Sequence, residues 1–197
     1  MSSRTKINRV LCRYDKVNSM FKRESALNMF AACSLSLMDR VGPALAVKFG
    51  RPESEITTLI SVRQCEHFTV GWLSEVLRLT HSAAVRIADR LERDGLLQRI
   101  TLPNRRYVGL MLTNAGTEFV GEVLKERRNI LESHFSVIPD ELLEQVMPVI
   151  ETLLGNVTTD ELTAYQTCRQ CDAGMCTGLC AVDKKYASLD LGPPRVH

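Results

Sequence analysis

The stretch that decides the fold runs from Leu79 to Gly116 and reads LTHSAAVRIADRLERDGLLQRITLPNRRYVGLMLTNAG. Its first part, His81–Arg93, has apolar residues at helical spacing on one side and polar residues on the other. Thr80 stands where a hydroxyl can cap the first turn, and Gly95 stands where a glycine commonly ends a helix. The sequence therefore predicts an amphipathic helix with defined ends.

After this helix the spacing changes to that of β-strands. Leu96–Ile100 and Tyr107–Leu112 are the predicted strands, and residues 103–106 between them, Pro-Asn-Arg-Arg, favour a turn. The stretch thus continues into a hairpin with two adjacent arginines at its tip.

Another helix is predicted directly upstream, at Val70–Leu79, with very few residues before His81–Arg93. A short helix pair followed by a hairpin is the order of a winged helix-turn-helix, whose second helix enters the major groove of DNA. We therefore expect a mainly α fold with a winged helix-turn-helix and a two-stranded wing. Double-stranded DNA is the expected partner.

The candidate DNA contacts lie on the polar side of the predicted recognition helix and at the hairpin tip. Ser82 and Arg86 are expected to point into the groove, and Arg90 to meet backbone phosphate, since arginine binds both guanine and phosphate. The full predicted set is Thr80, His81, Ser82, Arg86, Arg90, Arg105 and Arg106. Solvated helix faces with intrahelical ion pairs are the structural alternative.

Helical spacing extends on both sides of this region. The helix Ser25–Phe49 is expected to kink or break at Pro43, and a helix from Pro139 or Asp140 to Leu154 is expected to close at Gly155. Thr158 to Glu161 fits a capping box for a further helix. The expected organisation is a basic arm at 1–24, dimerisation and support helices at 25–65, the winged helix-turn-helix at 66–116, dimerisation helices at 117–156, a cysteine-rich segment at 157–187 and a disordered tail at 188–197.

The composition is that of a globular protein, with 45% hydrophobic and 24% charged residues. Because the net charge is only +2, DNA binding must depend on where cations gather. The basic residues of the first 24 predict either an arm near phosphates or a solvated helix face. No apolar run long enough to span a membrane and no secretory signal is recognised, so a cytoplasmic protein is expected.

Two parts of the opening stretch resemble the MarR family of regulators. Leu79–Arg99 resembles that family's recognition helix and first wing strand, and Asn104–Gly116 resembles its wing signature and the start of the next helix. The resemblance covers roughly Ser25 to Leu154 and implies a homodimer, built from the N- and C-terminal helices, that reads a palindromic operator. Asn104 stands where the family usually has Asp, which implies a weaker brace for Arg106 because an amide carries no charge.

Four of the seven cysteines fall in one short run with the spacing C-x2-C-x4-C-x3-C. Thiolates so close in sequence can converge on one centre with little loop entropy. A single run favours an iron–sulfur cluster over zinc, which more often uses two separated pairs. Zinc, a thiol–disulfide switch and a chance grouping stay open as alternatives. The predicted ligands are Cys168, Cys171, Cys176 and Cys180.

The predicted function is a DNA-binding transcriptional regulator whose operator binding is modulated by an iron–sulfur cluster or by another metal or redox state of the cysteines. Assembly of the centre is expected to order Thr158–Tyr186 at the end of the dimerisation helices and to bias the spacing of the recognition helices. The alternatives are a redox or electron-transfer protein that uses the winged helix as a dimer scaffold, and a regulator with a structural zinc. No catalytic constellation is recognised, so an enzyme is not expected.

Overall fold

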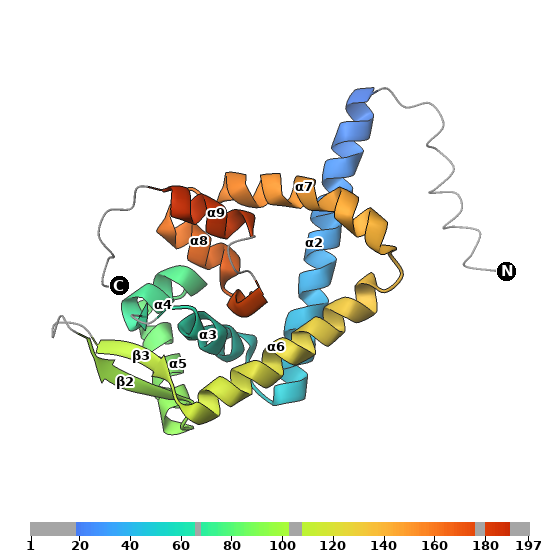
Figure 1. The fold of residues 1–197 in the computed structure, drawn as a ribbon. Coiled ribbons are helices and arrows are strands. Elements are labelled where there is room, and N and C mark those ends of the chain that lie inside the picture. Colours follow the sequence, from blue (N-terminus) through green and yellow to red (C-terminus); the bar gives the residue numbers. More distant parts are fainter. Residues whose placement is uncertain (1–18, 66–67, 103–107, 176–179, 190–197) are drawn as a thin grey trace. The chain divides into compact units, whose positions relative to one another are not determined.

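The computed structural model describes residues 19–65, 68–102, 108–175 and 180–189. The chain divides into two compact units, Met1–Arg40 and Val41–His197, and helix α2 (Ser19–Phe49) contributes to both. The remaining elements, shown in Figure 1, are α3 (Glu53–Arg63), β1 (Phe68–Thr69), α4 (Val70–Leu77), α5 (His81–Arg93), β2 (Leu97–Thr101), β3 (Val108–Leu112), α6 (Asn114–Phe135), α7 (Asp140–Val157), α8 (Glu161–Cys168), a 3-10 turn (Ala173–Met175) and α9 (Ala181–Ser188).

The described part of the first unit is the N-terminal portion of α2, and its large apolar side chains are exposed. They are Leu27, Met29, Phe30, Leu35 and Met38. The segment Lys22–Phe49 has a mean hydropathy of 1.3, and it is long and apolar enough to cross a membrane. The expectation that no apolar run is long enough to span a membrane is therefore wrong. A helix that buries its apolar side against another subunit passes the same test, so this property by itself does not indicate a membrane protein.

In the second unit the winged helix-turn-helix is confirmed, with α4 and α5 followed by the antiparallel pair β2 and β3. The sheet has three strands in the order β1-β3-β2, because Phe68 and Thr69 pair with Leu110 and Gly109. Only the two wing strands are predicted from the sequence, since β1 is just two residues long. The wing hairpin is thereby joined to the base of α4.

The core of this unit lies between α3, α4, α5 and α6. Leu59, Leu73, Leu91 and Val120 come from these four helices in turn, and each has 0% exposed surface. Helix α3 is buried over eight consecutive residues from Glu55 to Val62, polar ones included. It therefore forms the central helix that the other elements cover.

Three predicted boundaries in the second unit are wrong. Helix α2 does not break at Pro43, because Val41 and Leu45 on either side of it are buried and hold the backbone in place. Helix α7 continues past Gly155 to Val157, and the next helix is capped not by Thr158 but by Asp160, in a capping box with Thr163. An additional helix, α9, extends to Ser188 and occupies part of the segment in which no helix is predicted.

Helix α7 is amphipathic, as predicted, but none of its side chains is buried. The exposed large apolar residues of this helix are Leu142, Val146, Met147, Val149, Leu153 and Val157. Since burial of such residues is the main source of tertiary stability, α7 presents an apolar surface that the single chain does not cover.

Candidate nucleic-acid interface and cysteine cavity

The start of the recognition helix α5 is fixed by the residue predicted to cap it. Thr80 Oγ1 accepts a hydrogen bond from the backbone N–H of Ala83 at 3.2 Å and lies 3.2 Å from the hydroxyl of Ser82. The side chains of His81, Ser82 and Arg86 are exposed, and Ser82 and Arg86 lie on the side of α5 opposite its buried residues. This face can approach a DNA groove without any change in the core.

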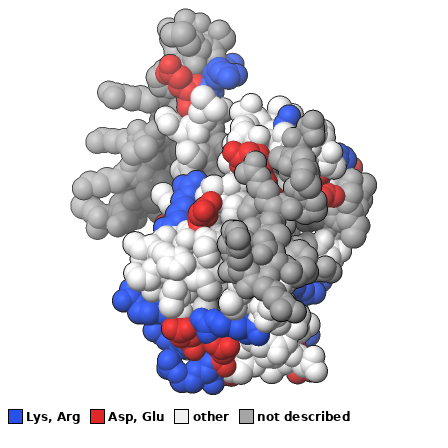
Figure 2. Space-filling view, turned by 90° about the vertical axis from the view of Figure 1, so that its left-hand side faces the viewer, with Lys and Arg blue, Asp and Glu red and all other residues white. Residues whose placement is uncertain are grey.

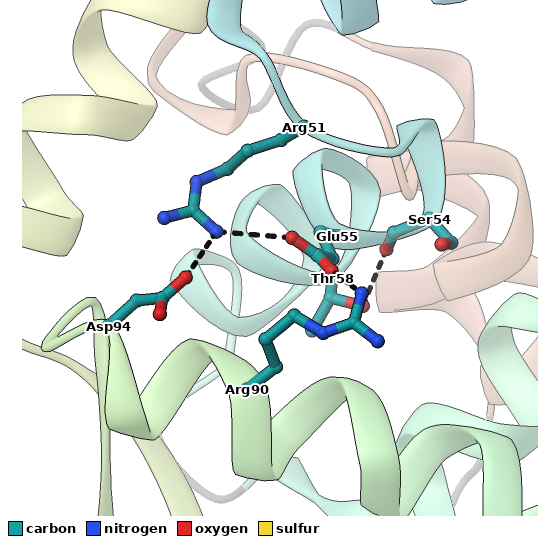
Figure 3. A network of polar contacts seen from close by, with 6 residues as sticks. All are labelled: Arg51, Ser54, Glu55, Thr58, Arg90 and Asp94. Carbon is teal, nitrogen blue, oxygen red and sulfur yellow. Dashed lines mark hydrogen bonds and ion pairs between the residues drawn. The ribbon is translucent and has the colours of Figure 1, made fainter.

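Arg90, the fourth candidate on α5, takes part in a network that the sequence does not reveal. Glu55 of α3 is only 1% exposed, and its two carboxylate oxygens accept hydrogen bonds from Arg90 and from Arg51 (Figure 3). Arg51 also bonds the carboxylate of Asp94, at 2.7 Å, just after α5. Glu55 of α3 is therefore connected to the C-terminal half of α5, directly through Arg90 and by way of Arg51 to Asp94.

This pairing does not decide whether Arg90 contacts DNA, because half of its side chain, 51%, remains exposed. The signal for Glu55 in the sequence is weak. The run Thr57 to Ser61 carries no charge, which is typical of a helix buried on all sides. A carboxylate at the edge of such a run must be paired, but the sequence does not name its partners.

Charged side chains of both signs gather at the end of the unit where α5, β2 and the start of α6 lie (Figure 2). Arg99 of β2 is paired with Asp89, at 2.6 Å, and with Glu92. The hydrogen bond to Asp89 is the main cause of a raised pKa for Arg99. Two acidic residues of α5 therefore neutralise Arg99 locally, whereas Arg86 is among the candidates with no ion pair to any described residue.

The wing arginines Arg105 and Arg106, together with Asn104, lie outside the described residues. Their assignment as DNA contacts stays a prediction. The two strands on either side of them pair with each other, with β2 ending at Thr101 and β3 beginning at Val108.

Three of the four predicted metal ligands line one cavity of about 230 Å³: Cys168, Cys171 and Cys180. Cys176 lies outside the described residues. None of the cysteines in the described ranges forms a disulfide. Within those same ranges, no three His, Cys, Asp or Glu side chains are grouped closely enough to hold a metal ion.

The remaining wall of the cavity is largely aromatic and aliphatic. Tyr165 of α8 packs edge to face on Trp72, with ring centroids 5.7 Å apart, and on Tyr186 of α9 at 6.4 Å. The hydroxyl of Tyr186 donates a hydrogen bond to Glu161 at 3.0 Å. Burial, followed by this bond to a carboxylate, raises the pKa of Tyr186 to about 12.

The charge around Cys171 favours its thiolate. A hydrogen bond from Cys168 is the largest cause, and the positive charges of Arg127 and Arg169 add to it against the opposing effect of burial. Together they lower the pKa of Cys171 to about 6. Two cysteines lie outside this segment: Cys33 is exposed on α2, and Cys65 is half-buried.

The cysteine segment is anchored to the second unit mainly through its backbone. Gln64, the C-cap residue of α3, donates hydrogen bonds to the carbonyl oxygens of Cys168, at 2.8 Å, and Cys171, at 3.2 Å. Ser61 donates to the carbonyl of Arg169 at 3.2 Å. The cysteine segment is predicted to lie at the end of the dimerisation helices, and its helix α9 does lie against α7. Its other helix, α8, lies instead against α4 of the winged helix.

Sequence comparison finds two curated repressors. The HTH-type transcriptional repressor MdtR of Bacillus subtilis is 29% identical over 115 residues, which are 58% of this chain and 74% of MdtR. The transcriptional repressor MprA of Escherichia coli is 32% identical over 111 residues, which are 55% of this chain and 63% of MprA. No family model matches the chain.

Among solved structures, a MarR family protein from Bacillus stearothermophilus is similar with a TM-score of 0.63 and 20% identity. The match covers 73% of this chain and all of that one. The fold is therefore the winged-helix fold of MarR proteins. In fold and in part of its sequence the chain is therefore similar to MarR-type proteins, and the curated relatives that it matches are transcriptional repressors.

Proposed function

We propose that the protein binds a palindromic DNA operator as a homodimer and regulates transcription in the cytoplasm. The observation that carries the proposal is the free polar face of α5, with Ser82 and Arg86 exposed beside a wing hairpin. In a winged helix-turn-helix this face is the one that reads the major groove.

A homodimer follows from the apolar surface of α7. Two copies that cover each other's Leu142, Val146 and Val149 would remove a large apolar area from water, which stabilises association. A twofold-symmetric dimer presents two copies of α5, so its operator should be palindromic.

Selection from a randomised duplex library tests DNA recognition. The wild-type chain should enrich a palindrome and bind it with a strong dependence on salt concentration. Arg86→Ala should weaken binding about tenfold to a hundredfold, the usual effect of losing one bidentate base contact. Lys125→Ala is the control, because it removes an exposed cation from α6, outside the recognition helix.

Enrichment of no sequence, with equal binding to all duplexes, would overturn the proposal. It would favour instead the alternative in which the winged helix is only a dimer scaffold for a redox or electron-transfer protein.

The finer part of the proposal concerns the cysteines. Cys168, Cys171, Cys176 and Cys180 would hold an iron–sulfur cluster, or else zinc, whose state modulates operator binding. The spacing in a single run supports the cluster, and three of the four predicted ligands line one cavity, where their side chains would have to move closer together to hold a metal ion. Thiolate sulfur is the ligand that both centres prefer.

Metal analysis of anaerobically purified protein distinguishes these centres. A brown protein with matched iron and sulfide supports the cluster, and a colourless protein with stoichiometric zinc supports a zinc site. Cys171→Ser should lose the centre, whereas Cys33→Ser, which changes an exposed cysteine of the first unit, should keep it. Wild-type protein with neither metal would overturn this part of the proposal.

A further inference from the structure

Helix α8 makes two hydrogen bonds to the turn of the helix-turn-helix, both through Gln166. Its amide oxygen accepts from Arg78 Nη2 at 3.1 Å, and its amide nitrogen donates to the carbonyl oxygen of Glu75 at 3.0 Å. Glu75 lies in the last turn of α4, and Arg78 is the residue that ends it. One side chain from the cysteine segment therefore holds the turn that leads into α5.

The turn that Gln166 holds has an unfavourable backbone. Arg78 has a φ of 54°, and it is the one non-glycine residue of the described ranges with a positive φ. The left-handed conformation is unfavourable for an L-residue, so it persists where surrounding contacts fix it. Arg78 precedes the N-cap Thr80 by two residues, and its conformation sets the direction in which α5 begins.

The same helix carries the first of the four cysteines. α8 ends at Cys168, two residues after Gln166, and Gln64 bonds the carbonyl of Cys168. Tyr165, next to Gln166, packs on Trp72 of α4. Figure 1 shows α8 beside α4 and α9. A shift of Cys168 thus moves the group that holds the turn.

We infer that Gln166 is a positioning residue for DNA recognition, which fixes the turn between α4 and α5 and passes the state of the cysteine segment to the recognition helix of the same protomer. The inference rests on the proposed function and deepens it. In the sequence analysis, the state of the cysteines is expected to reach the recognition helices through the dimerisation helices. Here it reaches the winged helix by a direct contact with the cysteine segment.

Gln166→Ala tests the positioning role, with Gln170→Ala as its matched control. Gln170 belongs to the same segment and also makes two side-chain hydrogen bonds, which it donates to Glu53 and Thr57, but both of these residues lie on α3 and away from the turn. Gln166→Ala should weaken binding to the selected duplex about three- to tenfold, the value of one or two hydrogen bonds. Gln170→Ala should change it less than about twofold.

Hydrogen exchange separates positioning from a general loss of stability. The amides of Arg78 and Leu79 bond the carbonyls of Glu75 and Ser74. They should exchange faster in Gln166→Ala, while the urea midpoint stays close to that of Gln170→Ala. Gln166→Glu keeps an acceptor for Arg78 but loses the donor to Glu75, and its affinity should lie between those of wild type and Gln166→Ala.

A double-mutant cycle tests the transmission. Cys171→Ser should change DNA affinity severalfold in the wild-type background and less than about twofold in Gln166→Ala. Equal effects in both backgrounds, or wild-type affinity in Gln166→Ala itself, would overturn the inference and leave the proposed function standing. No effect of Cys171→Ser in wild type would instead refute modulation by the cysteines, which belongs to the proposed function.

Discussion

Glu55 is a buried carboxylate whose two oxygens are each bonded by a different arginine, Arg51 and Arg90. Glu55→Gln keeps the shape of the side chain but removes its charge, and it should lower the free energy of unfolding by about 1–3 kcal/mol. Urea denaturation of the full chain measures this loss. Asp94→Asn changes the exposed partner of Arg51 and should cost less than about 1 kcal/mol. Equal losses in the two variants would show that burial of Glu55 is not what makes its pairs matter.

Tyr186 gives the protein a dependence on alkaline pH. Its pKa is about 12 in the folded protein, whereas an unfolded chain ionises near pH 10. Between these values the folded state holds a proton that the unfolded state has lost, so stability falls as pH rises from about 10 towards 12. The urea midpoint should decrease more steeply over this range for wild type than for Tyr186→Phe. Parallel decreases would contradict the assignment.

The sequence predicts residues well where their function is local and poorly where it depends on distant contacts. Thr80 and Gly95 are confirmed at the two ends of α5 because caps depend on neighbouring residues. Arg90, the second partner of Glu55, and both partners of Gln166 lie 35 to 91 residues away in the sequence, and no local pattern specifies them. Of the seven predicted DNA contacts, Ser82 and Arg86 lie on one exposed face of α5, and the wing arginines stay a prediction.

At the scale of elements, the junction of the wing with α6 depends on a close backbone approach. A Cβ on Gly116 would lie 2.0 Å from the carbonyl oxygen of Leu96, which also accepts a hydrogen bond from Thr113. Gly116→Ala should therefore destabilise the protein by about 1–3 kcal/mol, because the strand and helix must separate. Gly121→Ala on the same helix has open space around it and should stabilise by about 0.5–1 kcal/mol. Thermal unfolding of the two variants gives the comparison.

The elements themselves are mostly predicted correctly, since hydrophobic periodicity is a local signal. The errors fall where tertiary burial overrides a local preference, as at Pro43 between Val41 and Leu45. Helix α9 is short, and its one buried residue, Val182, gives too little periodicity to be recognised. Its contacts with α7 and α8 support it instead.

At the scale of the whole molecule, the apolar surface of α7 predicts an obligatory partner. Val146→Glu should shift the protein towards monomer in analytical ultracentrifugation, with a dimer dissociation constant raised at least about tenfold by burial of an unpaired charge. Gln145→Glu adds the same charge at a neighbouring exposed position and should leave the dimer intact. A wild-type protein that sediments as a monomer at micromolar concentration would contradict the proposed assembly.

The backbone anchoring of the cysteine segment has an evolutionary consequence. Ser61 and Gln64 donate hydrogen bonds to backbone carbonyl oxygens, which every amino acid possesses, and not to the sulfur atoms. Cysteines can therefore be gained or lost without changing how the segment is attached. Homologues that lack the four cysteines should still retain Ser61 and Gln64 and keep α8 against the winged helix. A regulator with a different signal can then arise on the same scaffold by exchanging only the residues that line the cavity.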